Sequence, residues 1–521
     1  MGVYRRPRPR RRPVAGPGPG RDADAAKRDV ARRSGNPRRA AYQVLAAVEN
    51  REAYANLLLP RLLAERDITG RDAALATELA YGTLRGQGTY DAVLAACSDR
   101  PLDQLDPPVR QILRLGAHQL LSTRIGAHAA VATSVDLAKQ VVGPRVSGYV
   151  NAVLRRVASR DLDAWLAIVA PDPATDLDGS LAVRYGYPRW IVAAYRAALG
   201  GVGDEELEAA LAAGNARPKV TLATFPGGPD RDQVMPAEAE PGRWSPYAFT
   251  LDSGNPAKLI ASGQAAVQDE GSQLAAIALT RAPVGPAAPA DAAGAGDGER
   301  WLDLCAGPGG KARLLHGLAA SADRPARLVA AELHPHRAAL VSEALARTAD
   351  HGVGTEVVVA DGTKPPWPDG AFDRVLVDAP CSGLGALRRR PEARWRKAES
   401  DLPALAELQR TLLRSALAAV RPGGVVGYVT CSPVPAETSD VVTAVAAADP
   451  NIEILDATAV LRGDDPPYPP EQARSKGEDT GPALLAPVPD TGSAGPLFAQ
   501  LWPHRHGTDA IFIAFLRRRE S

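Results

Sequence analysis

The sequence predicts an α/β protein: a Rossmann-like, mostly parallel, doubly wound sheet with an antiparallel closing strand, preceded by an all-α bundle and a small α+β connector. Three observations predict this class. Strand-like and helix-like blocks alternate from residue 300 onward, a glycine-rich turn follows the first of these strands, and residues 37–160 carry only helical periodicity. A chain of 521 residues is also too long for one ordinary core.

The helical region shows apolar residues at helical spacing. The stripes consist of Ala41, Val44, Leu45 and Val48, then Val131, Val135, Ala138 and Val142, and finally Val150, Val153, Leu154 and Val157. The last stripe is accompanied by Arg155 and Arg156, with Arg160 just beyond it. These arginines predict either a face that holds RNA or an ordinary solvated helix face.

Shifts in composition divide the chain. Residues 1–36 hold a dense arginine cluster among Pro and Gly, which predicts a disordered basic arm that either attracts nucleic-acid phosphates or is only a solvated tail. The expected domains are an all-α domain over 37–160, a connector over 161–245 and the α/β domain over 246–521. Within the last, the low-complexity residues 282–299 predict a flexible insertion.

Five apolar runs build the predicted parallel sheet. They read "RWLDLCA", "RLVAAEL", "TEVVVAD", "DRVLVDAP" and "GVVGYVT", and helical stretches separate them. Two later runs, "LFAQLWP" and "DAIFIAFLRR", are expected to close the sheet as a hairpin at its edge. Ligands bind open α/β sheets at the carboxyl ends of the strands, so we expect the site there.

The turn "LDLCAGPGGKA" follows the first strand of this sheet. A nucleoside triphosphate loop is excluded, because Cys305 and Ala312 stand where that loop needs Gly and Ser or Thr. The residues Gly307, Gly309 and Ala312 match the dinucleotide pattern G-x-G-x-x-A. The pattern alone therefore leaves the cofactor open between a dinucleotide and a ligand that carries a carboxylate.

Acidic residues end three of the predicted strands. Glu332 is placed to bind ribose hydroxyls, Asp361 to lie on the adenine side, and Asp378 to lie near the reacting centre. This series suits S-adenosylmethionine, which has a ribose, an adenine and a carboxylate but no phosphate. For each residue taken alone, capping of its own loop is the competing interpretation.

Two of the four cysteines, Cys381 and Cys431, each come just after a predicted strand. A thiolate that adds to C6 of a pyrimidine makes C5 nucleophilic, and a second thiol can assist the later release of the first. For Cys97 and Cys305 we favour the role of small buried hydrophobes.

The bulk properties set wider limits. The net charge of +1 says nothing about partners, and no apolar run approaches the roughly 20 residues of a membrane span. The N-terminus lacks the apolar core of a signal peptide. Widely spaced cysteines without a CxxC pair argue against disulfides and zinc, and for a cytoplasmic protein. We read the histidines of "HRH" at 504–506 as loop residues and expect no metal site.

The motifs "DAPCSGLG" and "YVTCSP" together resemble the RNA cytosine-5 methyltransferases of the RsmB/Fmu (Sun) family. "LDLCAGPGGK" is similar to that family's cofactor loop, "VQDEGSQLAA" to the segment before its catalytic domain, and "VNAVLRR" to its NusB-like RNA-binding domain. The similarity covers roughly residues 37–518. Where the family has Glu-Asn-Glu after its second cysteine motif, this chain reads "AETSD", and only Glu437 matches.

The resemblance implies a role for each matching residue. Cys431 would be the nucleophile, Cys381 would assist product release, and Asp378 would bind the cytosine edge near the methyl donor; the reverse assignment of the two thiols stays open. S-adenosylmethionine would be held by Cys305, Ala306, Gly307, Pro308, Gly309, Gly310, Lys311, Glu332, Asp361 and Asp378. From the sequence alone, Lys311 has either a structural role or pairs with a carboxylate.

The leading hypothesis is therefore a cytoplasmic, monomeric enzyme that uses S-adenosylmethionine to form 5-methylcytosine in RNA, with 16S rRNA as the implied substrate and tRNA as an alternative. A second hypothesis is a non-catalytic NusB-like RNA-binding or antitermination factor. A third, from the glycine pattern, is a nicotinamide-dependent dehydrogenase. Binding of S-adenosylmethionine or of NAD discriminates among the three.

Overall fold

The computed structural model describes residues 35–51, 53–201, 203–252, 256–285, 298–322, 326–348, 354–463 and 497–520. It divides into two compact units, one of residues 1–84 and 93–165, the other of residues 85–92 and 166–521. The expected basic arm and most of the expected insertion at 282–299 lie outside the described residues. Within the described ranges, no helix has both the length and the hydrophobicity that crossing a membrane requires.

The first unit is built of helices, as the sequence predicts. They are α2 (Pro37–Arg51), α3 (Ala55–Glu65), α4 (Gly70–Arg85), α5 (Gln87–Cys97, which continues from the second unit), η1 (Leu102–Gln104), α6 (Pro107–Ser122), α7 (Ala127–Val141), η2 (Pro144–Val146), α8 (Ser147–Val157) and α9 (Leu162–Val169). The stripes on α2 and α8 are buried throughout. Val142 is 37% exposed because α7 ends one residue before it, so its side chain leaves the stripe.

The second unit begins with three helices and a small antiparallel sheet. The helices are α10 (Leu177–Tyr185), α11 (Arg189–Ala198) and α12 (Asp204–Asn215), and α13 (Arg231–Val234) and α14 (Ala257–Ala261) lie between strands. The described strands have the order β2-β3-β1-β4 and are β1 (Val220–Ala223), β2 (Glu240–Pro241), β3 (Ala248–Leu251) and β4 (Ala266–Val267). Because β3 and β4 lie beyond residue 245, this sheet continues past the boundary expected from sequence.

The main sheet of the described residues has the order β10-β12-β9-β8-β5-β6-β7. Its strands are β5 (Arg300–Asp303), β6 (Arg327–Glu332), β7 (Thr355–Val359), β8 (Phe372–Asp378), β9 (Val420–Thr430), β10 (Ile452–Leu455) and β12 (Phe512–Arg518). The strands β5 to β9 pair in parallel, and β12 is antiparallel to β9. The predicted fold class is therefore confirmed.

The position of the closing strand differs from the prediction. The short strand β11 (Ala499–Gln500) does pair with β12, but β12 lies between β9 and β10 and is not at the sheet edge. The edge strand is β10, in "NIEIL", which the sequence analysis left unassigned. Burial on both faces explains the continuous apolar run of β12.

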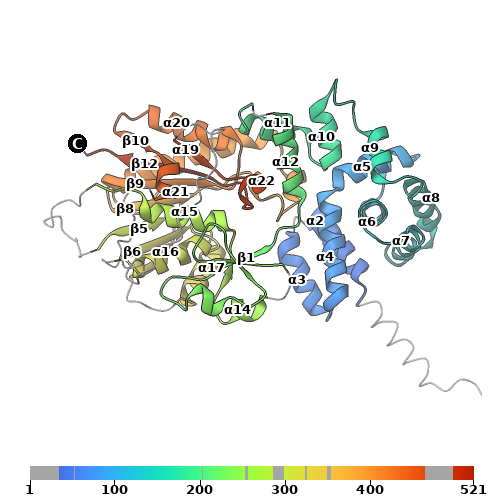
Figure 1. Ribbon diagram of the computed structural model, residues 1–521, viewed down its shortest axis with the longest axis horizontal. Helices are drawn as coiled ribbons and strands as arrows, with labels where there is room; N and C mark the ends of the chain where they lie inside the picture. The colour runs from blue at the N-terminus through green and yellow to red at the C-terminus, as the bar shows by residue number, and fades with distance from the viewer. Residues whose placement is uncertain are drawn as a thin grey trace, which may run out of the picture. The chain divides into compact units, whose positions relative to one another are not determined.

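Helices cover both faces of this sheet (Figure 1). On one face α15 (Glu270–Arg281), α16 (Gly310–Ala320) and α21 (Ala457–Arg462) pack against Trp301, Leu376 and Phe515. On the other, α19 (Leu402–Ala419) and α20 (Ser439–Ala447) pack against their strand neighbours Leu302 and Val377. Alternate residues of a strand point to opposite faces, so each central strand contributes to both cores. Helix α17 (Pro335–Ala346) packs beside α16 and β6.

Candidate active site

The two cysteines that follow predicted strands meet at the carboxyl ends of two neighbouring central strands of the main sheet. Cys381 follows β8 and Cys431 follows β9, and these strands are parallel neighbours with Asp378 opposite Val429. Their sulfur atoms lie 3.3 Å apart. Both side chains are partly exposed and neither forms a disulfide. The sheet register therefore brings together two thiols that are 50 positions apart in sequence.

The hydrogen bond between the two thiols and the charges around them give Cys381 and Cys431 different pKa values. A hydrogen bond from Cys381 lowers the pKa of the Cys431 thiol, and the ammonium of Lys311 acts in the same direction, against burial and the Asp378 charge. The same hydrogen bond, together with burial, raises the pKa of Cys381. Because thiolate is the reactive form, this arrangement favours Cys431 over Cys381 as the nucleophile.

Lys311 lies beside this pair at the start of α16. Its Nζ donates to Oδ2 of Asp378 at 2.7 Å, so it takes the carboxylate-pairing role. Burial alone would lower the pKa of Lys311, but the charge and hydrogen bond of Asp378 raise it above its ordinary value. A lysine that stays protonated here supplies a positive charge next to Cys431 and fixes the Asp378 side chain.

The glycine turn connects β5 to α16 and approaches Glu332 closely. The backbone N–H of Gly307 donates to Glu332 Oε2 at 3.2 Å, and a Cβ at Gly307 would lie 2.2 Å from that oxygen. Gly309 has a φ of 110°, which favours glycine. The buried Glu332 also accepts from the backbone of His334 and pairs with Arg337. Position 307 therefore needs glycine because its backbone lies against the Glu332 carboxylate, and position 309 needs it because of its positive φ.

Asp303 is a residue that sequence reasoning missed. It ends β5 fully buried, and neither of its carboxylate oxygens has a hydrogen-bond partner among the described residues. Burial, and then the Asp378 charge, raise its pKa to about 7. The available signal was a carboxylate inside the otherwise apolar run "WLDLCA". Next to it, burial raises the pKa of Cys305, which keeps that thiol neutral.

Asp361 lies apart from this cluster in its interactions. It is exposed, and its Oδ1 accepts from the backbone N–H and the hydroxyl of Thr363 at 2.9 and 2.7 Å. These bonds lower the pKa of the Asp361 carboxyl. In this structure Asp361 therefore caps its own turn at the end of β7, the competing interpretation that the sequence left open.

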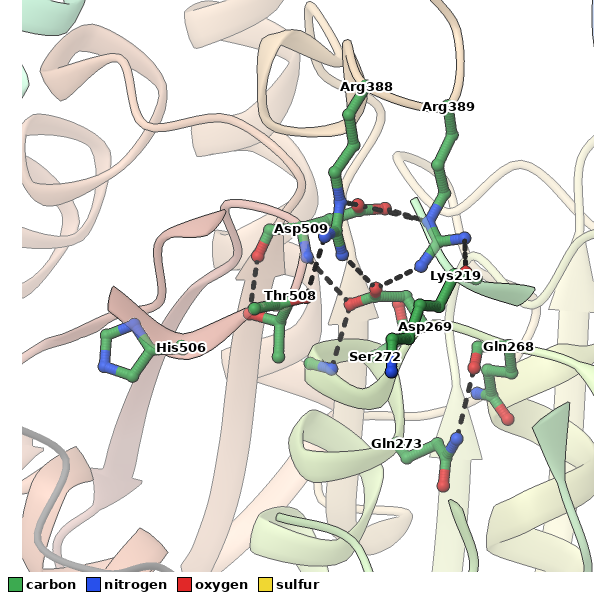
Figure 2. Close-up of polar contacts among 12 residues, drawn as sticks. Lys219, Gln268, Asp269, Ser272, Gln273, Arg388, Arg389, His506, Thr508 and Asp509 are labelled. Carbon is green, nitrogen blue, oxygen red and sulfur yellow. Dashed lines mark hydrogen bonds and ion pairs between the residues drawn. The ribbon is translucent and has the colours of Figure 1, made fainter. Parts of the chain in front are cut away.

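The segment after Cys381 is anchored by buried ion pairs (Figure 2). Arg388 pairs with Asp269 at 2.9 Å and with Asp509 at 2.5 Å, and Arg389 pairs with the same two carboxylates. Asp269 caps α15, and Asp509 precedes β12. Sequence reasoning missed this network because a run such as "RRRPEARWR" is usually a solvated face.

Three further hydrogen bonds hold the cysteine loop from other sides. The N–H of Gly385 donates to the carbonyl of Cys431 at 2.8 Å, and Ala510 donates to the carbonyl of Gly385 at 2.9 Å. The hydroxyl of Tyr195, on α11, donates to the carbonyl of Leu384 at 2.6 Å. The connector helices therefore support the cysteine loop directly.

Comparisons with known proteins show which family this sequence belongs to. The family model "16S rRNA methyltransferase RsmB/F" matches residues 294–517, and the NusB family model matches residues 35–159. The chain is 35% identical to the ribosomal RNA small subunit methyltransferase B of Pseudomonas putida, over 81% of this chain and 91% of the relative. The chain belongs to the RsmB/F family.

Other similarities agree with this membership. The chain is 49% identical to the Mycobacterium tuberculosis protein Rv1407, over 92% of this chain and 96% of the relative. The crystal structure of PH0851 superposes with a TM-score of 0.69 at 21% identity, over 93% of this chain and 98% of that one. That likeness shows the shared fold.

As an RsmB/F family member, the chain is an rRNA methyltransferase that uses S-adenosylmethionine. This leaves the non-catalytic and dehydrogenase hypotheses without support. The site residues fit the cofactor, since the buried Asp303 carboxylate has no hydrogen-bond partner among the described residues and suits a ligand with cationic groups. The glycine turn that follows Asp303 has no side chains at its glycines, so a ligand can approach its backbone closely.

The "HRH" histidines are built into the RsmB/F-type fold as structural residues. They lie in the short helix α22 (Pro503–His506), where the sequence analysis placed a loop. His504 bonds to Glu206, and His506 Nδ1 accepts from the backbone of Trp502 at 2.8 Å. Burial lowers the pKa of His506 to about 4, so it stays neutral at pH 7. Among the described residues, no group of three or more His, Cys, Asp or Glu could hold a metal ion.

Proposed function

We propose that this enzyme forms 5-methylcytosine in 16S rRNA through a covalent bond between Cys431 and cytosine C6. The observation that carries the proposal is the pair of partly exposed thiols 3.3 Å apart, with Lys311 beside Cys431. A family whose description names 16S rRNA, and a relative named for the small subunit, support the choice of substrate. A cytoplasmic monomer fits this proposal.

The residues divide the reaction into steps. The Cys431 thiolate adds to C6, which raises the electron density at C5 of the ring. S-adenosylmethionine supplies an electrophilic methyl group when bound. After methylation, a base takes the C5 proton, the C6–S bond breaks and its electron pair returns to the Cys431 sulfur; Cys381 assists this release. We assign Asp378, which accepts a hydrogen bond from Lys311, to the cytosine edge.

We assign the cofactor to the residues proposed from sequence. Residues 305–311 form the glycine turn and the start of α16, Glu332 is the last residue of β6, and Asp361 follows β7. We assign Glu332 to the ribose and Asp361 to the adenine side, and we add Asp303 as the carboxylate closest in sequence to the turn. Binding of the ribose to Glu332 competes with the contacts that Gly307 and Arg337 now make.

The N-terminal unit offers a surface for the RNA backbone. A hollow of about 460 Å³ is lined by Ala96, Cys97, Arg155, Arg156, Ser159, Arg160 and Trp165. The three arginines are exposed, and Arg160 lies over the Trp165 ring at 5.2 Å. Guanidinium groups suit phosphates, so this hollow supports the RNA-holding interpretation of the last helix stripe.

Substitution of each thiol tests the mechanism. Cys431→Ala should abolish methyl transfer, because no thiolate is left to add to C6. Cys381→Ala should accumulate a covalent RNA adduct, which migrates slowly on a denaturing gel. If Cys431→Ala accumulates the adduct instead, the two roles are reversed. Methyl transfer at the normal rate by Cys431→Ala would refute covalent catalysis by this thiol.

Bisulfite sequencing of total RNA tests the substrate. Cells that carry the gene should show a 5-methylcytosine in 16S rRNA that cells without the gene lack. Loss of a site in tRNA alone would support the alternative substrate and contradict the assignment to 16S rRNA.

A further inference from the structure

A buried carboxylate connects the two cysteine loops. Glu437 lies in the one-turn helix η5 (Pro435–Glu437) and has no exposed surface. Its Oε1 accepts from the backbone N–H of Ser382 at 2.7 Å. Its Oε2 accepts from the hydroxyls of Ser382 and Ser432 at 2.5 and 2.6 Å. Ser382 directly follows Cys381 and Ser432 directly follows Cys431, so one side chain holds the residue after each thiol.

Glutamine 409 extends this connection to the other side of Cys381. The Nε2 of Gln409, on α19, donates to Glu437 Oε1 at 3.2 Å and to the carbonyl of Pro380 at 2.9 Å. The hydroxyl of Tyr428 donates to the carbonyl of Glu437 at 2.8 Å. Hydrogen bonds to a buried carboxylate are charge-assisted and short, so this contact set fixes the geometry of both loops.

Charges of opposite sign act on the two sulfur atoms. The negative charge of Glu437 is one of the causes that raise the pKa of Cys381, after the Cys431 hydrogen bond and burial. The positive charge of Lys311 acts on Cys431 and lowers its pKa. A carboxylate that acts on Cys381 and an ammonium that acts on Cys431 therefore polarise the sulfur pair in one direction.

We propose that Glu437 is a positioning residue for methyl transfer: its carboxylate holds the Cys381 and Cys431 loops together and makes Cys431 the more reactive of the two thiols. The inference rests on the proposed function, which assigns these two thiols to the reaction. It gives a physical reason why the second motif supplies the nucleophile. The charged and titratable groups that act on the pair are Lys311, Asp378, Tyr428, Glu437 and Asp509.

The test is the rate of alkylation of each thiol by iodoacetamide between pH 6 and 10, read by mass spectrometry of peptides. In the wild-type enzyme, Cys431 should react faster than Cys381 at pH 7.5, because more of it is present as thiolate. The ratio of the two rates should be roughly tenfold for each unit by which their pKa values differ. In Glu437→Gln the profile of Cys381 should move to lower pH, and the ratio of the two rates should fall toward one. Glu356→Gln removes an exposed carboxylate from β7 and should leave both profiles unchanged.

A purely structural role for Glu437 predicts a different result, in which both thiols change together and their ratio stays constant. That outcome would overturn the proposal. Alkylation needs no RNA, so it is independent of the proposed function, which fails separately if the wild-type enzyme transfers no methyl group to rRNA cytosine.

A second variant covers the case in which Glu437→Gln does not fold. Ser432→Ala keeps the charge of Glu437 and removes one hydrogen bond to the loop of Cys431. We expect kcat to fall roughly tenfold, which corresponds to one hydrogen bond to a charged group, with the Kd for S-adenosylmethionine unchanged. An unchanged kcat would contradict the positioning role.

Discussion

At the scale of single residues, the site depends on which groups carry charge. Lys311 is mostly buried and pairs with Asp378, and its charge acts on Cys431 and Asp378. Asp303 is buried without a hydrogen bond among the described residues, and its pKa is close to physiological pH. The charge of Lys311 should change the pH dependence of thiol alkylation, and that of Asp303 the pH dependence of cofactor binding.

The first residue-scale prediction concerns Lys311. Replacement by glutamine removes the positive charge that lowers the pKa of Cys431, so that pKa should rise and less thiolate should be present at pH 7.5. Alkylation of Cys431 should slow by about tenfold for each unit of change. Lys258→Gln, at an exposed position on α14, is the matched control. An unchanged Cys431 profile in Lys311→Gln would show that the ammonium does not activate the thiol.

The second residue-scale prediction concerns Asp303. Its carboxyl is ionised above a pKa of about 7 and protonated below it. A cationic ligand prefers the ionised form, so the affinity for S-adenosylmethionine should fall as the pH is lowered from 8 to 6. Calorimetry measures this, and Asp303→Asn should bind weakly with little pH dependence. A variant that keeps the wild-type pH dependence would assign the effect to another group.

At the scale of elements, the cysteine loop depends on contacts from three directions. The ion pairs of Arg388 and Arg389 connect it to α15 and to the start of β12. Glu437 connects it to the loop after β9, and Tyr195 connects it to α11. These elements come from widely separated parts of the chain, so the loop takes its shape only after they have packed.

The element-scale prediction is the effect of removing Asp509. The buried Arg388 and the partly buried Arg389 would then share a single carboxylate, that of Asp269, and loss of one partner from a buried pair costs about 3–5 kcal/mol. The free energy of unfolding in urea should fall by about that amount in Asp509→Ala. Asp232→Ala removes an exposed carboxylate paired with Arg231. This variant should change the free energy of unfolding by less than about 1 kcal/mol. Equal effects of the two variants would contradict a buried network.

At the scale of the whole molecule, chemistry and RNA holding are proposed for different units. The thiols and the glycine turn belong to residues 166–521, whereas the arginine-lined hollow belongs to the N-terminal unit. Substitutions in that hollow should therefore change RNA binding without changing the thiols.

The whole-molecule prediction is made for Arg155→Gln combined with Arg160→Gln. The KM for rRNA should rise several-fold, and the slope of its logarithm against the logarithm of salt concentration should become shallower, because fewer phosphates are neutralised. The kcat and the alkylation rate of Cys431 should stay unchanged. Arg61→Gln, at a position 77% exposed on α3, is the control. A fall in kcat with an unchanged KM would contradict a role in RNA holding.

The sequence by itself determined the fold class, the helical first region and the positions of both thiols, because periodicity and strand ends are local features. Its motifs also indicated the family. It did not reveal that Asp303 lacks a hydrogen bond among the described residues, or that Arg388 is buried and Arg389 partly buried, since burial depends on neighbours distant in the chain. Only the tertiary structure brought the charge of Lys311 to act on Cys431 and that of Glu437 to act on Cys381. Electrostatic effects depend on distance in space, and packing alone fixes that distance.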